Sequence, residues 1–175
     1  MPKTIAVVGA GRVGRTLARA LRRRGYRIGA VVTRSLRTAR AAARFIGAGR
    51  PVGLMSDELS RADVVLIATP DGQIARTARL LARGRASWRG RIALHASGAL
   101  EARELAALKK RGTAVGCFHP MFPFPRPLAV LPPGITFGLS GDARAVRVAS
   151  PATHQFTGKQ AEPGNVVAVA VAVAA

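Results

Sequence analysis

Short apolar runs alternate with amphipathic stretches along most of the chain. The apolar runs are rich in β-branched residues and predict buried strands at residues 4–9, 27–33, 51–54, 63–69, 91–95, 113–118 and 135–139. The stretches between them predict helices over 12–24, 35–46, 73–83 and part of 98–111, and a last helix that begins at Asp142 and is ended by Pro151. This alternation is typical of βαβ units. The predicted fold class is therefore α/β, with a doubly wound, mostly parallel sheet covered by helices on both faces.

The stretch from residue 150 to the end differs in kind from the rest. Polar, loop-like residues precede a Val/Ala tract at 166–175, which is compatible with a strand, a helix or disorder, and whose alternation favours the strand. We therefore predict a domain over residues 1–149 and an atypical tail over 150–175. The tract is shorter than the roughly 20 apolar residues that cross a bilayer. Because the N-terminus also lacks signal-peptide features and Cys117 is the single cysteine, we expect a cytoplasmic protein without membrane contact.

The chain carries 28 basic and 8 acidic residues, which gives a net charge of +20. A charge of this size raises the hypothesis of nucleic-acid binding. The basic residues, 24 of them arginines, are however spread over several predicted helices and form no basic arm with interleaved aromatic residues. This spread favours arginines that occupy solvent-facing helix positions, so nucleic acid is the less favoured partner.

Residues 9–14 read GAGRVG, which is the pattern G-x-G-x-x-G between the first predicted strand and the first predicted helix. In this context the pattern is typical of a dinucleotide-binding loop of the Rossmann type. Gly9 permits the tight turn, Gly11 lets a pyrophosphate approach the backbone, and Gly14 lets the helix pack against the strand. The phosphates then meet the free N–H groups and the positive end of the helix. The alternative is a glycine-rich turn without a ligand.

The end of the second predicted strand indicates which coenzyme is bound. NAD-binding proteins usually place an Asp or Glu there for the ribose hydroxyls, whereas the first acidic residue of this chain is Asp57. Arg34 and Arg37 are placed to hold a 2′-phosphate by charge-assisted hydrogen bonds, and Ser35 is placed to donate another. The sequence therefore predicts NADP(H) rather than NAD(H). The alternative is that Arg34 and Arg37 are two more surface arginines.

Residues 68–71, with the sequence ATPD, close the predicted strand 63–69. Ligands of doubly wound sheets lie outside the carboxyl ends of the strands. We therefore expect this segment, Asp71 included, to line the coenzyme near its nicotinamide. The other interpretation, compatible with the first, is an ordinary strand-to-helix turn in which Asp71 caps the helix.

Two histidines stand at the ends of the next two predicted strands. If those strands are neighbours, the rings of His95 and His119 could meet, and a neutral imidazole exchanges protons readily near pH 7. His119, His95 and Ser97 are therefore candidate catalytic residues, while Ser97, Gly98 and His119 are candidate substrate-binding residues. The alternative is that both histidines bond loop backbone. No metal site is predicted, because Cys117 and His119 share a strand face but no carboxylate cluster or second cysteine accompanies them.

In this order and spacing, the segments GAGRVG, VVTRS, DVVLIATPDGQI, HASGAL and FHPMFPFP resemble a family of uncharacterised oxidoreductases. Members of that family pair a Rossmann-like NADP-binding domain with a C-terminal helical domain of unknown function. The segments are more distantly similar to pyrroline-5-carboxylate reductases and β-hydroxyacid dehydrogenases. The resemblance covers about residues 3–149. It implies a substrate side at Ser97, Gly98 and His119, and coenzyme contacts at Gly9, Gly11, Arg12, Val13, Gly14, Thr33, Arg34, Ser35, Thr69 and Pro70.

Relatives continue beyond residues 141–142 with a long helix and an all-helical domain that helps to close the active site and usually forms a homodimer. Here the sequence from Ser150 onward does not fit that pattern. A truncated or frame-shifted gene would explain this change. We expect an NADP(H)-dependent oxidoreductase that transfers hydride to or from a carbonyl or imine carbon of a small molecule, or the coenzyme-binding half of one. The alternatives are a nonenzymatic NADP-binding module or sensor, and a basic nucleic-acid-binding protein.

Overall fold

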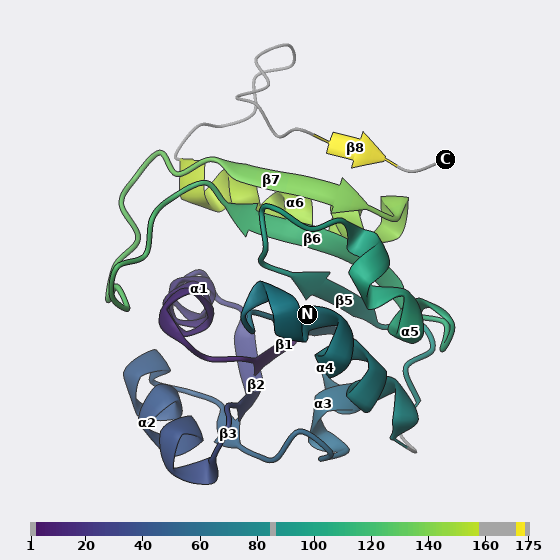
Figure 1. Cartoon of the computed structure of the whole chain (residues 1–175). Helices are drawn as coiled ribbons and strands as arrows, with labels where there is room; N and C mark the ends of the chain where they lie inside the picture. The colour runs from purple at the N-terminus through teal and green to yellow at the C-terminus, as the bar shows by residue number, and fades with distance from the viewer. Residues whose placement is uncertain (1–2, 85–86, 158–170, 174–175) are drawn as a thin grey trace.

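Residues 3–84, 87–157 and 171–173 are described in the computed structural model of the chain (Figure 1). The strands are β1 (Thr4–Val8), β2 (Arg27–Val32), β3 (Arg50–Pro51), β4 (Val64–Ile67), β5 (Ile92–His95), β6 (Ala114–Pro120), β7 (Phe137–Gly141) and β8 (Val171–Val173). The helices are α1 (Arg12–Arg23), α2 (Leu36–Ile46), α3 (Glu58–Arg61), α4 (Asp71–Arg83), α5 (Ala106–Lys109) and α6 (Ala143–Thr157), with a 3-10 turn, η1 (Ala102–Leu105), before α5.

The strands of the described residues form one sheet in the order β3-β2-β1-β4-β5-β6-β7-β8 (Figure 1). Neighbouring strands from β3 to β6 are parallel, whereas β7 pairs antiparallel with β6 and parallel with β8. After β3 the chain returns past β1 to begin β4, so the strand order changes direction between β1 and β4. In such sheets the ligand crevice lies outside the carboxyl ends of the strands at this point. The predicted doubly wound, mostly parallel fold is confirmed.

Alternate side chains of the strands enter two core layers, one on each face of the sheet. Ile5 and Val7 pack with apolar side chains of α1, α2 and α6, whereas Ala6 and Val8 pack with those of α3, α4 and α5. A parallel strand covered on both faces is apolar at nearly every position, because neither face meets water. This double burial explains why the strands appear in the sequence as continuous apolar runs.

Pro151 does not end the last helix as predicted, because it lies inside α6. A proline has no N–H and removes one backbone hydrogen bond from a helix interior. The helix nevertheless continues to Thr157, since Ala145, Ala149 and Ala152 are buried against the sheet on both sides of the proline. Tertiary packing therefore outweighs the local preference of the proline.

Several other element boundaries differ from the sequence prediction, and two of them lie near the candidate site. In place of one helix within 98–111, the chain forms η1 and the single turn α5. β6 runs two residues beyond the predicted end at 118, because β7 pairs with it as far as the Pro120–Phe137 pair. His119 therefore lies within a strand rather than at the start of a loop.

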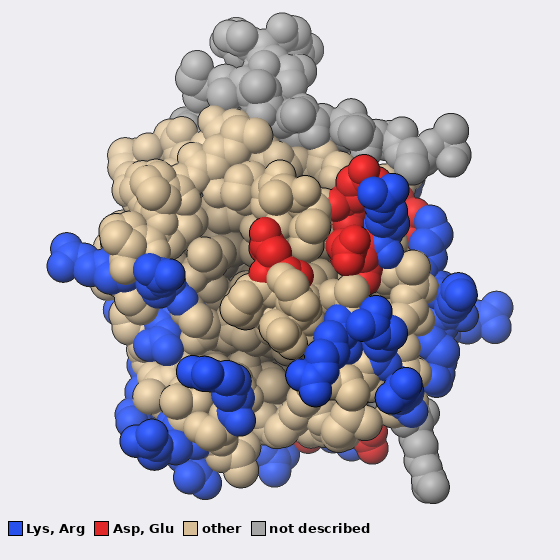
Figure 2. Space-filling view, viewed as in Figure 1, with Lys and Arg blue, Asp and Glu red and all other residues tan. Residues whose placement is uncertain are grey.

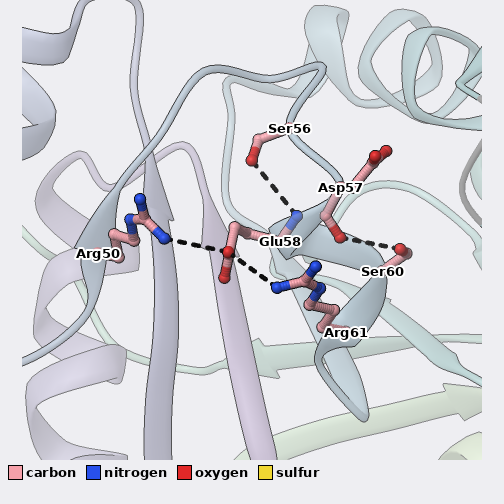
Figure 3. A network of polar contacts seen from close by, with 6 residues as sticks. All are labelled: Arg50, Ser56, Asp57, Glu58, Ser60 and Arg61. Atoms are coloured by element: carbon pink, nitrogen blue, oxygen red, sulfur yellow. Dashed lines mark hydrogen bonds and ion pairs between the residues drawn. The ribbon is translucent and has the colours of Figure 1, made fainter.

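The short helix α3, which the sequence analysis missed, carries a small polar network (Figure 3). Glu58 Oε1 lies 3.2 Å from Nη1 of both Arg50 and Arg61, and Glu58 N–H donates to Ser56 Oγ at 3.3 Å. Because both arginine side chains are more than 70% exposed, each ion pair contributes at most about 1 kcal/mol. The network links the edge strand β3 to α3.

The strand interpretation of the Val/Ala tract is confirmed for Val171–Val173, which lies beside β7. The rest of that tract and residues 158–165 lie outside the described residues, and the boundary at 149, which α6 crosses, stays a prediction. Within the described part of the chain, no helix combines the length and apolarity that a membrane span requires.

Candidate coenzyme and substrate site

The loop between β1 and α1 has two crowded glycines and one open glycine. Gly9 has a φ of +87°, and a Cβ there would lie 2.5 Å from Thr69 N. A Cβ on Gly14 would lie 2.5 Å from Gly9 O. On Gly11, by contrast, a Cβ would meet only Gly9 O at 3.9 Å, and Gly11 is exposed. The loop is thus packed tightly against the β4 turn and leaves space at the position where a pyrophosphate approaches the backbone.

The N-terminus of α1 is free to receive an anion. Gly11 is its N-cap residue, no side chain caps the helix, and its first turn contains no acid. The first N–H groups of a helix lack intrahelical partners and lie at its positive end. Val13 packs against the core, so only its N–H can serve a ligand. The guanidinium of Arg12 donates to Pro125 O at 3.2 Å, which directs it toward the proline-rich loop.

The turn between β2 and α2 brings the predicted 2′-phosphate residues together. Ser35, where the predicted helix begins, caps α2 with its Oγ accepting from Thr38 N–H at 3.2 Å. Thr33 Oγ1 donates to Ser35 O at 2.9 Å and also contacts Thr38 Oγ1. Arg34 and Arg37 are exposed. Thr33 and Ser35 thus hold the turn itself, and the side chains of the two arginines extend from it into solvent.

The segment after β4 lies against the glycine loop, as the close approach of Gly9 to Thr69 shows. The Oγ1 of Thr69 is a buried side-chain oxygen that has no hydrogen-bond partner. Asp71 does not cap α4: the N-cap residue is Pro70, no side chain caps the helix, and Asp71 is the first helical residue. Asp71 is exposed there, and its carboxylate is favoured by the positive end of the helix.

His119 lies against the turn that follows β5. Its Nδ1 is 3.2 Å from Ala96 O, and a Cβ on Gly98 would lie 2.4 Å from its Nε2. Because a carbonyl only accepts, Nδ1 carries the proton, and in the neutral ring Nε2 is left with its lone pair. The imidazole is half-buried. The neutral ring can therefore take a proton at Nε2, directly over Gly98, and the imidazolium form can give one there.

Ser97 is part of the same turn, and Cys117 contacts this turn from β6. Ser97 is 7% exposed, and its Oγ accepts from Ala99 N–H at 3.2 Å, which leaves its hydroxyl proton available. The Cys117 thiol donates to Ser97 O at 3.0 Å. This contact was not predicted, although the same-face spacing of Cys117 and His119 was the signal that could have revealed it.

His95 lies deeper than the other candidate residues. Its side chain is fully buried, its Nε2 lies 3.1 Å from Glu101 O, and its Nδ1 has no partner. Its cross-strand partner in β6 is Cys117, two residues before His119. Across the described residues no hydrogen bond joins the two rings. Burial is the largest influence on the pKa of His95 and lowers it. The bond to Glu101 and the charges of Asp71 and Glu104 raise this pKa, whereas the charge of His119 lowers it.

Cys117 is expected to resist thiol reagents in the folded protein. Burial raises its pKa from 9.0 to about 11, outweighing hydrogen bonds that lower it. The reactive species is the thiolate, and its fraction at pH 8 is roughly 100-fold smaller for the higher pKa. We expect slow labelling by iodoacetamide at pH 8, and labelling at the rate of a free thiol in denaturant. Equal rates with and without denaturant would contradict this expectation.

A loop at 121–136 packs along α1, a contact that the sequence analysis did not foresee. Leu128 N–H donates to Thr16 Oγ1 at 2.9 Å, and Arg19 Nε donates to Ala129 O at 3.1 Å. With the Arg12 contact to Pro125, these bonds join the loop that follows His119 to the helix that begins at the phosphate loop.

Among the residues that the structure describes, no three His, Cys, Asp or Glu side chains gather closely enough to hold a metal ion. Figure 2 shows Lys and Arg in several separate groups around the edge of one face, with acidic side chains nearer its centre. On this face the basic side chains do not merge into one continuous patch.

The sequence matches the Rossmann-like domain family over residues 2–120, which is more than half of the chain. The chain therefore belongs to the Rossmann-like domain family. No curated protein matches it in sequence.

Several solved structures share the fold at low sequence identity. A provisionally assigned NADP oxidoreductase from Bacteroides fragilis has a TM-score of 0.74 at 21% identity, over 89% of this chain and 57% of that chain. Arogenate dehydrogenase from Synechocystis has a TM-score of 0.70 at 19% identity, over 88% and 57%. An imine reductase from a Pseudomonas species has a TM-score of 0.67 at 18% identity, over 91% and 54%. This chain thus spans little more than half the length of these proteins, and the likeness shows the fold.

Proposed function

We propose that the chain binds NADP(H) and is an oxidoreductase, or the coenzyme-binding half of one, acting on a carbonyl or imine carbon of a small molecule. The observation that carries the proposal is the loop at residues 9–14. Its outer glycines admit no side chain, its middle glycine faces open space, and it begins an uncapped helix where the strand order changes direction. It is the combination of this open glycine with the two crowded glycines and the uncapped helix that supports the proposal, since single open glycines such as Gly53 also occur elsewhere in the chain.

The residues fit a dinucleotide laid across the carboxyl ends of β2, β1 and β4. The α1 N-terminus would hold the pyrophosphate through backbone N–H groups. Arg34 and Arg37, exposed beside the end of β2, would hold a 2′-phosphate, and no acid stands there to prefer free ribose hydroxyls. The segment from Thr69 to Asp71 would line the nicotinamide end.

When bound, the coenzyme would supply or accept the hydride, and the chain's own residues would place the substrate and manage its proton. His119 Nε2 faces Gly98 on the substrate side and would give a proton to the oxygen or nitrogen of the reduced group, or take it back in the other direction. The Ser97 hydroxyl proton is available to orient the same substrate. His119 contacts the turn that carries Ser97 through its bond to Ala96 O.

The direct test is a fluorescence titration of the full chain with NADPH and, separately, with NADH at moderate salt. We expect saturable binding with clear preference for NADPH. Binding of neither coenzyme would overturn the proposal. If duplex DNA abolishes NADPH binding at moderate salt, the nucleic-acid alternative is favoured instead. Moderate salt is the stringent condition, because protein–DNA binding weakens steeply as salt rises.

The variant His119→Asn tests the role of the substrate-side histidine. Its amide can replace the Nδ1–H bond to Ala96 O but has no titratable nitrogen at the Nε2 position. We expect unchanged NADPH affinity and a loss of about 10²–10⁴-fold in the rate of NADPH oxidation with a panel of aldehydes, ketones and cyclic imines. Full activity of the variant would contradict the assignment. Tight binding without turnover in the wild type would favour a nonenzymatic NADP-binding module.

A further inference from the structure

The turn at residues 96–101 is held by three side chains that all donate to its carbonyl oxygens. His119 Nδ1 lies 3.2 Å from Ala96 O, Cys117 Sγ lies 3.0 Å from Ser97 O, and His95 Nε2 lies 3.1 Å from Glu101 O. His119 and Cys117 come from β6 and His95 from the end of β5. The two histidines thus bond the beginning and the end of the turn that carries Ser97 and Gly98.

The hydrogen bonds fix opposite tautomers for the two rings. Since the Glu101 carbonyl only accepts, the proton of neutral His95 is on Nε2, whereas that of neutral His119 is on Nδ1. The Nδ1 of His95 is buried and has no partner, so protonating it would add an unpaired donor to the core. Burial also lowers the pKa of His95, although the nearby Asp71 and Glu104 raise it. A neutral ring is therefore the form that the surroundings favour.

We propose that His95 is a positioning residue rather than a catalytic one: its neutral imidazole fixes the end of the 96–101 turn, and thereby the placement of Ser97 and Gly98 against His119. Full burial keeps His95 from touching a substrate. Its bond to Glu101 determines where the turn ends, and the His119 ring has no room to shift toward Gly98, where even a Cβ would lie 2.4 Å from Nε2. The proposal rests on the proposed function only in naming this turn as the substrate side.

The first test is a long-range ¹⁵N–¹H spectrum of the histidine side chains of the full chain between pH 5 and 8. His119→Asn and His95→Gln assign the signals by their loss. We expect His95 to be mainly neutral at pH 6.5 with its proton on Nε2, because burial lowers its pKa, and neutral His119 to carry its proton on Nδ1. A doubly protonated His95 at pH 6.5, or a proton on its Nδ1, would overturn the proposal.

The second test compares two replacements of His95 by their effect on the tautomer of His119. The amide of Gln can restore the donor at the Nε2 position, whereas Leu fills the space without a donor. We expect His95→Gln to keep at least 80% of neutral His119 in the Nδ1–H form. We expect His95→Leu to lower that share at least twofold. An unchanged share in His95→Leu would overturn the proposal, as would an equal loss in both variants.

A matched control separates positioning from general destabilisation. Thr113 is 3% exposed, and its Oγ1 donates to Trp88 O at 3.2 Å, outside the 96–101 turn. Thr113→Val removes this comparable buried bond, and we expect the His119 tautomer to stay as in the wild type. NADPH affinity, measured on the same samples, reports on the phosphate loop, so failure of coenzyme binding is distinguishable from failure of this proposal. If His95→Leu does not fold, the wild-type spectrum and His95→Gln still decide it.

Discussion

Replacing Gly11 with valine is expected to lower NADPH affinity by at least about 100-fold, which corresponds to about 2.8 kcal/mol, while the protein stays folded. Gly11 has a φ of −76°, outside the left-handed region, and the nearest atom to its added Cβ is Gly9 O at 3.9 Å, so the added side chain has space. The branched side chain would instead occupy the space of the pyrophosphate. The measurements are an NADPH titration and a thermal melt.

Two further glycine variants provide the controls for Gly11→Val. At Gly53 no atom lies within 4 Å of an added Cβ, so Gly53→Val should change neither binding nor stability. At Gly14 the added Cβ would lie 2.5 Å from the backbone oxygen of Gly9, so Gly14→Val should lower the free energy of unfolding by about 1–3 kcal/mol through overpacking. Normal NADPH affinity of folded Gly11→Val would reject the loop as the coenzyme site.

Replacing Arg34 with alanine is expected to weaken NADPH binding roughly 10- to 150-fold, because a hydrogen bond to a charged group contributes about 1.5–3 kcal/mol. NADH affinity should change less than about twofold, since NADH lacks the 2′-phosphate that distinguishes the two coenzymes. Arg34 is exposed at the β2–α2 turn, so its loss should leave the fold unchanged. Parallel titrations with both coenzymes measure the effect.

The matched control for Arg34→Ala is Arg147→Ala. Arg147 is an exposed arginine on α6, outside the β2–α2 turn, and its removal lowers the net charge by the same amount. We expect this variant to bind both coenzymes as the wild type does. Equal losses of NADPH and NADH affinity in Arg34→Ala would show that Arg34 does not recognise the 2′-phosphate. Equal losses in the two arginine variants would indicate a general effect of charge.

The predictions that were confirmed depend on short stretches of sequence. A buried parallel strand is a continuous apolar run, so the run at 63–69 was recognisable without knowledge of its neighbours. The beginning of α2 also depends on local contacts, since Ser35 bonds a residue only three positions away. The spacing of the glycines at 9–14 likewise belongs to one strand–turn–helix unit.

The predictions that failed depend on contacts between distant residues. Pro151 ends a helix by its local chemistry, but α6 continues because its apolar face packs on the sheet. The extent of β6 was missed because the partner strand that lengthens it lies about twenty residues away.

The sequence by itself determined the strand–helix order, the glycine loop and the arginines beside it, because each rests on side-chain periodicity or on backbone freedom within a few residues. Only the tertiary structure decided which histidine is buried and which is partly exposed. His95 and His119 are both polar residues at strand ends, yet pairing of β5 with β6 places Cys117, not His119, opposite His95. This register leaves His95 fully buried under Glu101 and His119 half-exposed over Gly98. Strand register is fixed by the whole packed sheet, and no local pattern contains it.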